Sequence, residues 1–219
     1  GEPVLIKAEV KIKKDQIVVD FQGSSNQVRT NLNSPFASSV SSAIACIKAV
    51  LTDPDIPFNE GAERAVTVKI PHGSILNPKA PAPVRARLLP SYRVVNAVMD
   101  ALSHAVPDRV IAPGFDTTSV SCLSHRKDTG YNIYLEIFGG GFGAGPDNDG
   151  CDAVDSMLSN CSNIPIESME SDYPFFRVED YSLRSSSGGD GRNRGGMGFQ
   201  RIYKILEEDV TFATYGDRF

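Results

Sequence analysis

The chain has 219 residues, of which 41% are hydrophobic, 8% aromatic and 22% charged, a composition that excludes a disordered or fibrous protein. The 22 basic and 27 acidic residues leave a net charge of −5, which is not the basic footprint of a nucleic-acid-binding protein. Every apolar stretch is far shorter than the roughly 20 residues that a membrane-spanning helix needs.

The first half of the chain predicts a hairpin and two amphipathic helices. Strand-like alternation flanks a turn at Lys13–Gln16. Ser34 and Pro35 are a typical N-cap and first helical residue, and apolar residues at steps of three and four follow them. The predicted elements are, in chain order, a hairpin over 4–21, a helix over 35–51, a strand over 65–70 and a helix from about 91 to 106.

The second half predicts strands separated by glycine-rich loops, at 131–138, 175–183, 199–206 and 210–215. The fold class is therefore predicted to be α+β: a β-rich mixed fold with at least two amphipathic helices. Residues 1–110 carry the hairpin and helices, and residues 111–219 form a strand-rich part with the glycine-rich loops.

A glycine run, GGGFGAG over residues 139–145, directly follows a predicted strand that carries Glu136. It lacks the Gly-Lys-Ser/Thr ending of a Walker A loop. Two interpretations stay open for Gly139, Gly140 and Gly141. Their backbone N–H groups face an anion or a reacting carbonyl oxygen, or the run is a tight structural bend.

Three aspartates follow the glycine run. If the chain turns helical after Gly150, Asp149, Asp152 and Asp155 recur at steps of three on one face near a helix N-terminus. They then bind a cation or a polar substrate, or they form a solvated N-terminal turn.

Glycine and arginine alternate in the segment over residues 185–198. One interpretation is a shaped loop in which Arg192 or Arg194 faces a carboxylate or a phosphate. The other is a plain connection between two strands. The three histidines are scattered, and the four cysteines form no Cys-x-x-Cys pair, which indicates reduced thiols in a cytoplasmic protein.

At these segments the chain resembles the hydantoinase B/oxoprolinase family. The match is carried by several long strings in the same order as in the family: VDFQGSSNQVR over 19–29, NSPFA over 33–37, the segment 53–84, GGGFGAGPDNDGCDAVDSMLSNCSNIPIESME over 139–170 and LRSSSGGDGRNRGGMGF over 183–199.

The resemblance implies one half of a two-component enzyme. An A-type, ATP-binding subunit activates an amide, lactam or ketone, and the B component opens the ring or carboxylates the substrate. The family implies a divalent metal in the N-terminal half of the B component, a small-molecule substrate and a hetero-oligomer. No membrane or nucleic-acid partner is implied.

This chain is expected to be one region of that B component. It has no initiator methionine and less than half the family's length, so we expect a fragment that lacks the family's N-terminal half and extreme C-terminus. The metal is then expected on the missing segment, and no catalytic residue is assigned here. The predicted substrate-binding residues are Gly139, Gly140, Gly141, Asp149, Asp152, Asp155, Asn160 and Arg192.

The first functional hypothesis is a component of an ATP-dependent hydrolase that opens cyclic amides of the hydantoin or oxoproline type. Two departures from the family pattern leave room for an alternative. Leu89–Arg93 replaces the Glu-Thr-Ser-Gln-Arg of many ring-opening members, and Asp155 and Met157 stand where those members have histidines. The alternative is a ketone carboxylase of the acetone or acetophenone type, and the third hypothesis is a non-catalytic scaffold.

Overall fold

The computed structural model describes residues 3–128, 130–159 and 161–216. The chain divides into two compact units, unit 1 (Gly1–Ile111) and unit 2 (Ala112–Phe219). None of the helices in the described residues has the length and apolar character needed to span a bilayer.

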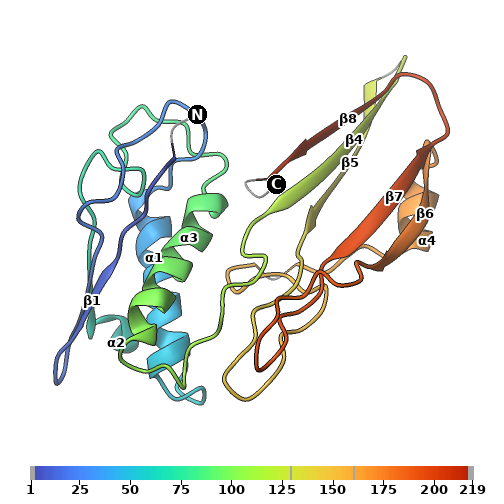
Figure 1. Cartoon of the computed structure of the whole chain (residues 1–219). Coiled ribbons are helices and arrows are strands. Elements are labelled where there is room, and N and C mark those ends of the chain that lie inside the picture. Colours follow the sequence, from blue (N-terminus) through green and yellow to red (C-terminus); the bar gives the residue numbers. More distant parts are fainter. Residues whose placement is uncertain (1–2, 129, 160, 217–219) are drawn as a thin grey trace. The chain divides into compact units, whose positions relative to one another are not determined.

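Unit 1 combines a three-stranded sheet with two long helices (Figure 1). Strand β2 pairs antiparallel with β1 through a turn closed by the Lys13 N–H, which donates to the Gln16 carbonyl at 2.8 Å, and pairs parallel with β3. The elements are β1 (Glu9–Ile12), β2 (Ile17–Asp20), α1 (Phe36–Leu51), α2 (Glu60–Glu63), β3 (Val66–Lys69) and α3 (Leu88–Ser103).

The core of unit 1 lies where α1 and α3 pack against each other and against the sheet. The inner stripe of α1 contributes Ile44, Cys46 and Ile47, and α3 contributes Tyr92 and Val98. These apolar residues recur at helical spacing, which is why the sequence predicted both helices. The Cys46 thiol is fully buried and lies 3.7 Å from the Val95 carbonyl oxygen.

The start of α1 differs by one residue from the prediction. Pro35 occupies the N-cap position, and Ser34 accepts a hydrogen bond from the Ser39 hydroxyl instead of capping the helix. Asn33 fixes the entry of the chain, because its buried side chain donates to the carbonyls of Val28 and Pro83.

Unit 2 contains two antiparallel sheets and a short helix (Figure 1). One sheet has the order β5-β4-β8, and β6 pairs with β7 in the other. The elements are β4 (Ser119–Lys127), β5 (Gly130–Phe138), α4 (Ile166–Asp172), β6 (Phe176–Leu183), β7 (Phe199–Ile205) and β8 (Val210–Tyr215). The predicted α+β class is confirmed.

The core of unit 2 joins the two sheets through α4 and the turn that follows it. Leu123 and Tyr134 from the first sheet meet Met169, Phe175 and Phe176, and all five are at most 1% exposed. The Tyr134 ring lies 5.0 Å from that of Phe176, within the range of favourable aromatic pairs. Aromatic packing therefore sets the geometry of the strands that carry the candidate site.

Candidate functional site

Unit 2 contains a half-open cavity of about 650 Å³ between its two sheets and its glycine-rich loops. Cavities of roughly 300–1,000 Å³ are typical of small-molecule sites. Its walls come from segments 112–115 and 138–144, from the loop between β6 and β7, and from side chains of β4, β7 and β8.

Glycine is required in this wall because three main-chain segments touch one another. A Cβ atom on Gly141 would lie 1.8 Å from the carbonyl oxygen of Gly196, and one on Gly143 would lie 1.6 Å from that of Ala112. The Phe115 N–H donates to the Gly141 carbonyl at 2.8 Å. The glycine loop (residues 139–145) thus lies against segments 112–115 and 194–198.

Several backbone N–H groups of the glycine loop are already used inside the protein. The Gly140 N–H donates to the Val154 carbonyl, and the Phe142 N–H donates to the Cys151 carbonyl, both at 2.9 Å. The structural-bend interpretation therefore accounts for the spacing of the glycines. At the same time, Gly139, Gly140 and Gly141 all line the cavity.

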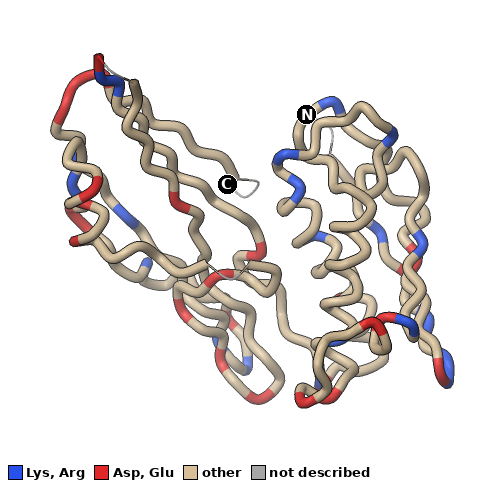
Figure 2. The backbone as a smooth tube through the Cα atoms, turned by 180° about the vertical axis from the view of Figure 1, so that it is seen from behind, with Lys and Arg blue, Asp and Glu red and all other residues tan. Residues whose placement is uncertain are grey.

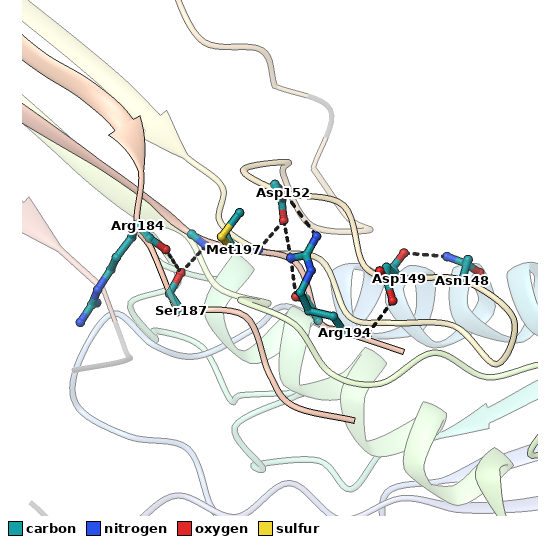
Figure 3. A network of polar contacts seen from close by, with 9 residues as sticks. Asn148, Asp149, Asp152, Arg184, Ser187, Arg194 and Met197 are labelled. Atoms are coloured by element: carbon teal, nitrogen blue, oxygen red, sulfur yellow. Dashed lines mark hydrogen bonds and ion pairs between the residues drawn. The ribbon is translucent and has the colours of Figure 1, made fainter. Parts of the chain in front are cut away.

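The loop between β6 and β7 is shaped by carboxylates of the segment after the glycine loop (Figure 3). Asp152 Oδ1 accepts from Arg194 Nη1 and from the Met197 N–H, each at 2.7 Å. Asp149 Oδ1 accepts from the Arg194 N–H at 2.6 Å. The hydrogen bond from Arg194, with that from Met197, lowers the pKa of Asp152. The prediction of a shaped loop that holds an arginine against a carboxylate is confirmed for Arg194.

The prediction that the chain turns helical after Gly150 is wrong. Residues 151–159 contain turns but no helix, and the next helix begins at Ile166. Ala153 has a φ of 52°, a left-handed conformation that interrupts a right-handed helix. Asp149 and Asp152 therefore face the β6–β7 loop, and Asp155 Oδ1 accepts from the Ser156 N–H at 2.9 Å.

A buried polar cluster lies between the two sheets, next to the cavity. Glu136 of β5 and Arg201 of β7 form an ion pair whose side chains are 4% and 2% exposed. The Tyr134 hydroxyl donates to the Glu136 carboxylate, and its oxygen lies 3.2 Å from that of the Tyr203 hydroxyl. The Ile164 N–H also donates to Glu136, at 3.0 Å.

The cluster perturbs the acid–base properties of its members. Burial, reinforced by the hydrogen bond to Glu136, raises the pKa of Tyr134 above its ordinary value, so that the hydroxyl keeps its proton. Burial alone lowers the pKa of Arg201, but Tyr203 and Glu136 outweigh that effect, and the pKa of the guanidinium lies above its ordinary value. Removing one partner of such a buried pair typically costs about 3–5 kcal/mol.

The sequence prediction did not include this cluster as a site. The available signal was the alternation in YNIYLEIF, which places Tyr134 and Glu136 two residues apart on one face of a strand. Arg201 had no such signal, because its partner lies 65 residues earlier in the chain.

The family model of hydantoinase B/oxoprolinase matches residues 2–219 of the chain. This chain belongs to the hydantoinase B/oxoprolinase family. It is 34% identical to the B-type subunit of a putative D-/L-hydantoinase of Pseudomonas sp. (strain NS671), over 97% of this chain and 36% of the Pseudomonas chain. The chain spans little more than a third of the length of the curated relatives with which it shares 34–40% identity.

Solved structures share the same fold. The ATP-dependent caprolactamase from Pseudomonas jessenii has a TM-score of 0.80 at 29% identity, over 90% of this chain and 35% of the caprolactamase chain. The nucleotide-free structure of an acetone carboxylase has a TM-score of 0.74 at 20% identity, over 94% of this chain and 28% of that chain. At 20% identity the second likeness shows the fold alone.

Only some of the residues predicted from the family resemblance line the cavity. Gly139, Gly140 and Gly141 do so, whereas Asp149, Asp152, Asp155 and Arg192 are not among its lining residues. Arg192 is exposed on the β6–β7 loop, and Asn160 lies outside the described residues. The assignment of these eight residues to substrate binding stays a prediction.

The described residues also offer no place for the divalent metal that membership of the hydantoinase B/oxoprolinase family implies. Within 3–128, 130–159 and 161–216, no group of three or more His, Cys, Asp or Glu side chains is arranged to hold a metal ion. The donor set of these residues therefore does not fit such a metal.

Proposed function

We propose that this chain forms part of the catalytic B component of an ATP-dependent hydrolase that opens cyclic amides. The observation that carries the proposal is the similarity to caprolactamase. The two chains have a TM-score of 0.80 and 29% sequence identity over 90% of this chain. The match to a putative hydantoinase supports the same reaction class.

The partner in this proposal is an A-type subunit that binds and hydrolyses ATP, and the assembly is a heteromer in the cytoplasm. The Pseudomonas relative is named as one subunit of a hydantoinase, which supports a multi-component enzyme. The four cysteines of this chain are free thiols, which agrees with a reducing compartment. The divalent metal is assigned to a part of the B component that this chain does not contain.

In the complete enzyme, this chain would contribute the cavity of unit 2 to substrate binding. Its volume of about 650 Å³ suits a small cyclic amide. One side of the cavity is made of main chain, and the other carries polar side chains such as Ser121, Arg201 and Tyr203. Such a lining suits a ligand with a few hydrogen-bonding groups.

The test is an assay of the complete B component with its A-type subunit, ATP and a panel of lactams, hydantoins and 5-oxoproline. Ring opening coupled to ADP release is the expected result. If no cyclic amide is opened while a ketone and bicarbonate are consumed together, the carboxylase alternative replaces the proposal.

The scaffold alternative makes a different prediction in the same assay. Substituting Asp149 and Asp152 by Asn weakens the hold on the β6–β7 loop, which borders the cavity. A site role predicts a complex that assembles normally and turns over slowly. A scaffold role predicts lost assembly, measured by size-exclusion chromatography, with normal turnover in whatever complex remains.

A further inference from the structure

Arg201 lines the cavity but satisfies only part of its hydrogen-bonding capacity. Its side chain is 2% exposed, and Nη1 bonds to Glu136 and lies 3.4 Å from the Tyr134 hydroxyl. Among the described residues, Nε and Nη2 make no hydrogen bond of acceptable distance and angle, although both atoms are buried; the Tyr203 and Tyr181 side chains also interact with the guanidinium and raise its pKa. Buried donors are almost always paired, and leaving them unpaired is costly, most of all on a charged group.

The two unpaired nitrogens define one edge of the guanidinium. Nε and Nη2 project their N–H bonds side by side, whereas Nη1 points away from them toward Glu136. The rings of Phe138 and Tyr181 lie against the guanidinium, with their centroids 5.1 Å and 4.1 Å from its central carbon. The contact with Phe138 and the bond to Glu136 fix the plane of the fork before any ligand arrives.

The charge of the cavity wall favours an anion. The ionisable side chains among its lining residues, apart from tyrosine, are Arg184, Arg201 and Asp190, which gives 2 − 1 = +1. The guanidinium of Arg184 points away from the Asp152–Arg194 pair (Figure 3) and has no ion pair among the described residues. Glu136 pairs with Arg201 through Nη1 and does not itself line the cavity, so it leaves the Nε and Nη2 donors of Arg201 free of a carboxylate.

We propose that the cavity of unit 2 binds a carboxylate, whose two oxygens accept hydrogen bonds from the Nε and Nη2 edge of Arg201, with Arg184 as a second cation. A carboxylate matches two parallel N–H donors in one plane. Both nitrogens are shielded from water, so a carboxylate reaches them only after a neighbouring side chain has moved. We expect the Tyr181 ring, which is 37% exposed, to shift on binding. This inference concerns the group that the cavity recognises, and it holds whichever reaction the complete enzyme performs.

The experiment compares two ligands of equal shape, propionate and propionamide, by NMR titration of the purified protein. The wild type is expected to bind propionate roughly tenfold more tightly than propionamide, since hydrogen bonds to charged groups are the stronger ones. Arg201→Lys keeps a cation for Glu136 but removes the two-donor edge, and it is expected to lose that preference. The matched control is Arg177→Lys on β6, an exposed arginine that does not line the cavity, and it should bind like the wild type.

A second measurement covers the case in which Arg201→Lys does not fold. In the unmodified protein, propionate is expected to shift the side-chain ¹⁵Nε–H resonance of Arg201 and leave that of Arg177 in place. Equal affinity for propionate and propionamide in the wild type would overturn the proposal. So would a folded Arg201→Lys variant with an unchanged preference, or an Arg201 resonance that does not move at saturation. Turnover is not a readout, so failure of the ring-opening proposal leaves these outcomes unaffected.

Discussion

Tyr134 is a fully buried tyrosine whose hydroxyl has three polar neighbours: Glu136, Tyr203 and Arg201. Because burial and the bond to Glu136 raise the pKa of Tyr134, its hydroxyl keeps its proton and donates it in the hydrogen bond to Glu136. Glu136 in turn positions the Arg201 guanidinium beside the cavity. At the scale of single residues, the site depends on this chain of buried partners.

Cys46 is expected to resist alkylation in the folded protein. Burial raises the pKa of its thiol to about 12, and the thiolate is the reactive species. Iodoacetamide should label the exposed Cys151 and Cys161 within minutes and label Cys46 only after denaturation, as read by peptide mass spectrometry. Labelling of Cys46 at the same rate as Cys151 in native buffer would contradict the buried position.

Asp152 is expected to titrate below an ordinary aspartate. Its hydrogen bonds with Arg194 and Met197 lower the pKa from the ordinary 3.8, so its carboxylate stabilises the fold above pH 3.8. That contribution declines as the pH falls below 3.8 and is gone once the pH has passed below the folded pKa. A ¹³C NMR titration of the carboxyl should show the low pKa in the wild type and a higher one in Arg194→Gln. An unshifted wild-type titration would disprove the interaction.

The strands of unit 2 were predictable where β-branched and aromatic residues are frequent. β5, β6, β7 and β8 were predicted to within one residue, because each contains several such residues. β4, the central strand, was missed, since SVSCLSHRK has three serines and one β-branched residue, and its pairing with β5 and β8 is set by distant segments. The seven-residue helix α4 was missed because two turns carry little periodicity.

At the scale of loops and strands, close main-chain packing predicts different losses of stability when two glycines are replaced by alanine. Gly141→Ala places a Cβ atom 1.8 Å from a carbonyl oxygen, so the glycine loop must separate from segment 194–198. We expect a loss of about 1–3 kcal/mol or more in the free energy of unfolding, measured with urea. Gly189→Ala is the matched control, because no atom lies within 4 Å of its added Cβ, and its effect should stay within about 0.5 kcal/mol. Equal effects of the two substitutions would contradict the packing argument.

At the scale of the whole molecule, the two units differ in core and in charge. Unit 1 buries the faces of α1 and α3, and unit 2 buries an aromatic cluster. Residues 1–110 carry 13 basic and 10 acidic side chains (+3), and residues 111–219 carry 9 and 17 (−8). Figure 2 shows many of the acidic positions of unit 2 along its loops. Each unit therefore has the means to fold on its own interactions.

We expect the two units to unfold as separate cooperative transitions. The chain provides a probe for each, because Cys46 lies in unit 1 and all the tyrosines except Tyr92 lie in unit 2. Gly141→Ala should lower the melting temperature read from tyrosine fluorescence and leave the temperature at which Cys46 becomes alkylated unchanged. A single transition that shifts equally by both probes would show that the units unfold together.

The candidate site could be predicted only in part from the sequence. The glycine loop was visible as a run of residues, and it does line the cavity. Asp149 and Asp152 bind Arg194, and Glu136 binds Arg201. The residues in these contacts lie 42 to 65 positions apart in the sequence. Local patterns do not determine which carboxylate meets which arginine, because that pairing follows from how the sheets close.

The contact of the glycine loop with segments 112–115 and 194–198 bears on how this cavity can diversify. One wall is main chain packed on main chain, so its shape depends on the glycines and on the carboxylates of Asp149 and Asp152, not on the side chains that face the ligand. The facing wall consists of side chains such as Ser119, Ser121 and Phe212, which project from strands held by their own ladders. Mutation of these positions changes the size and polarity of the cavity while the loop keeps its course. Natural selection or directed evolution can therefore change which ligand the cavity binds by substituting these side chains, while the main-chain wall keeps its structure.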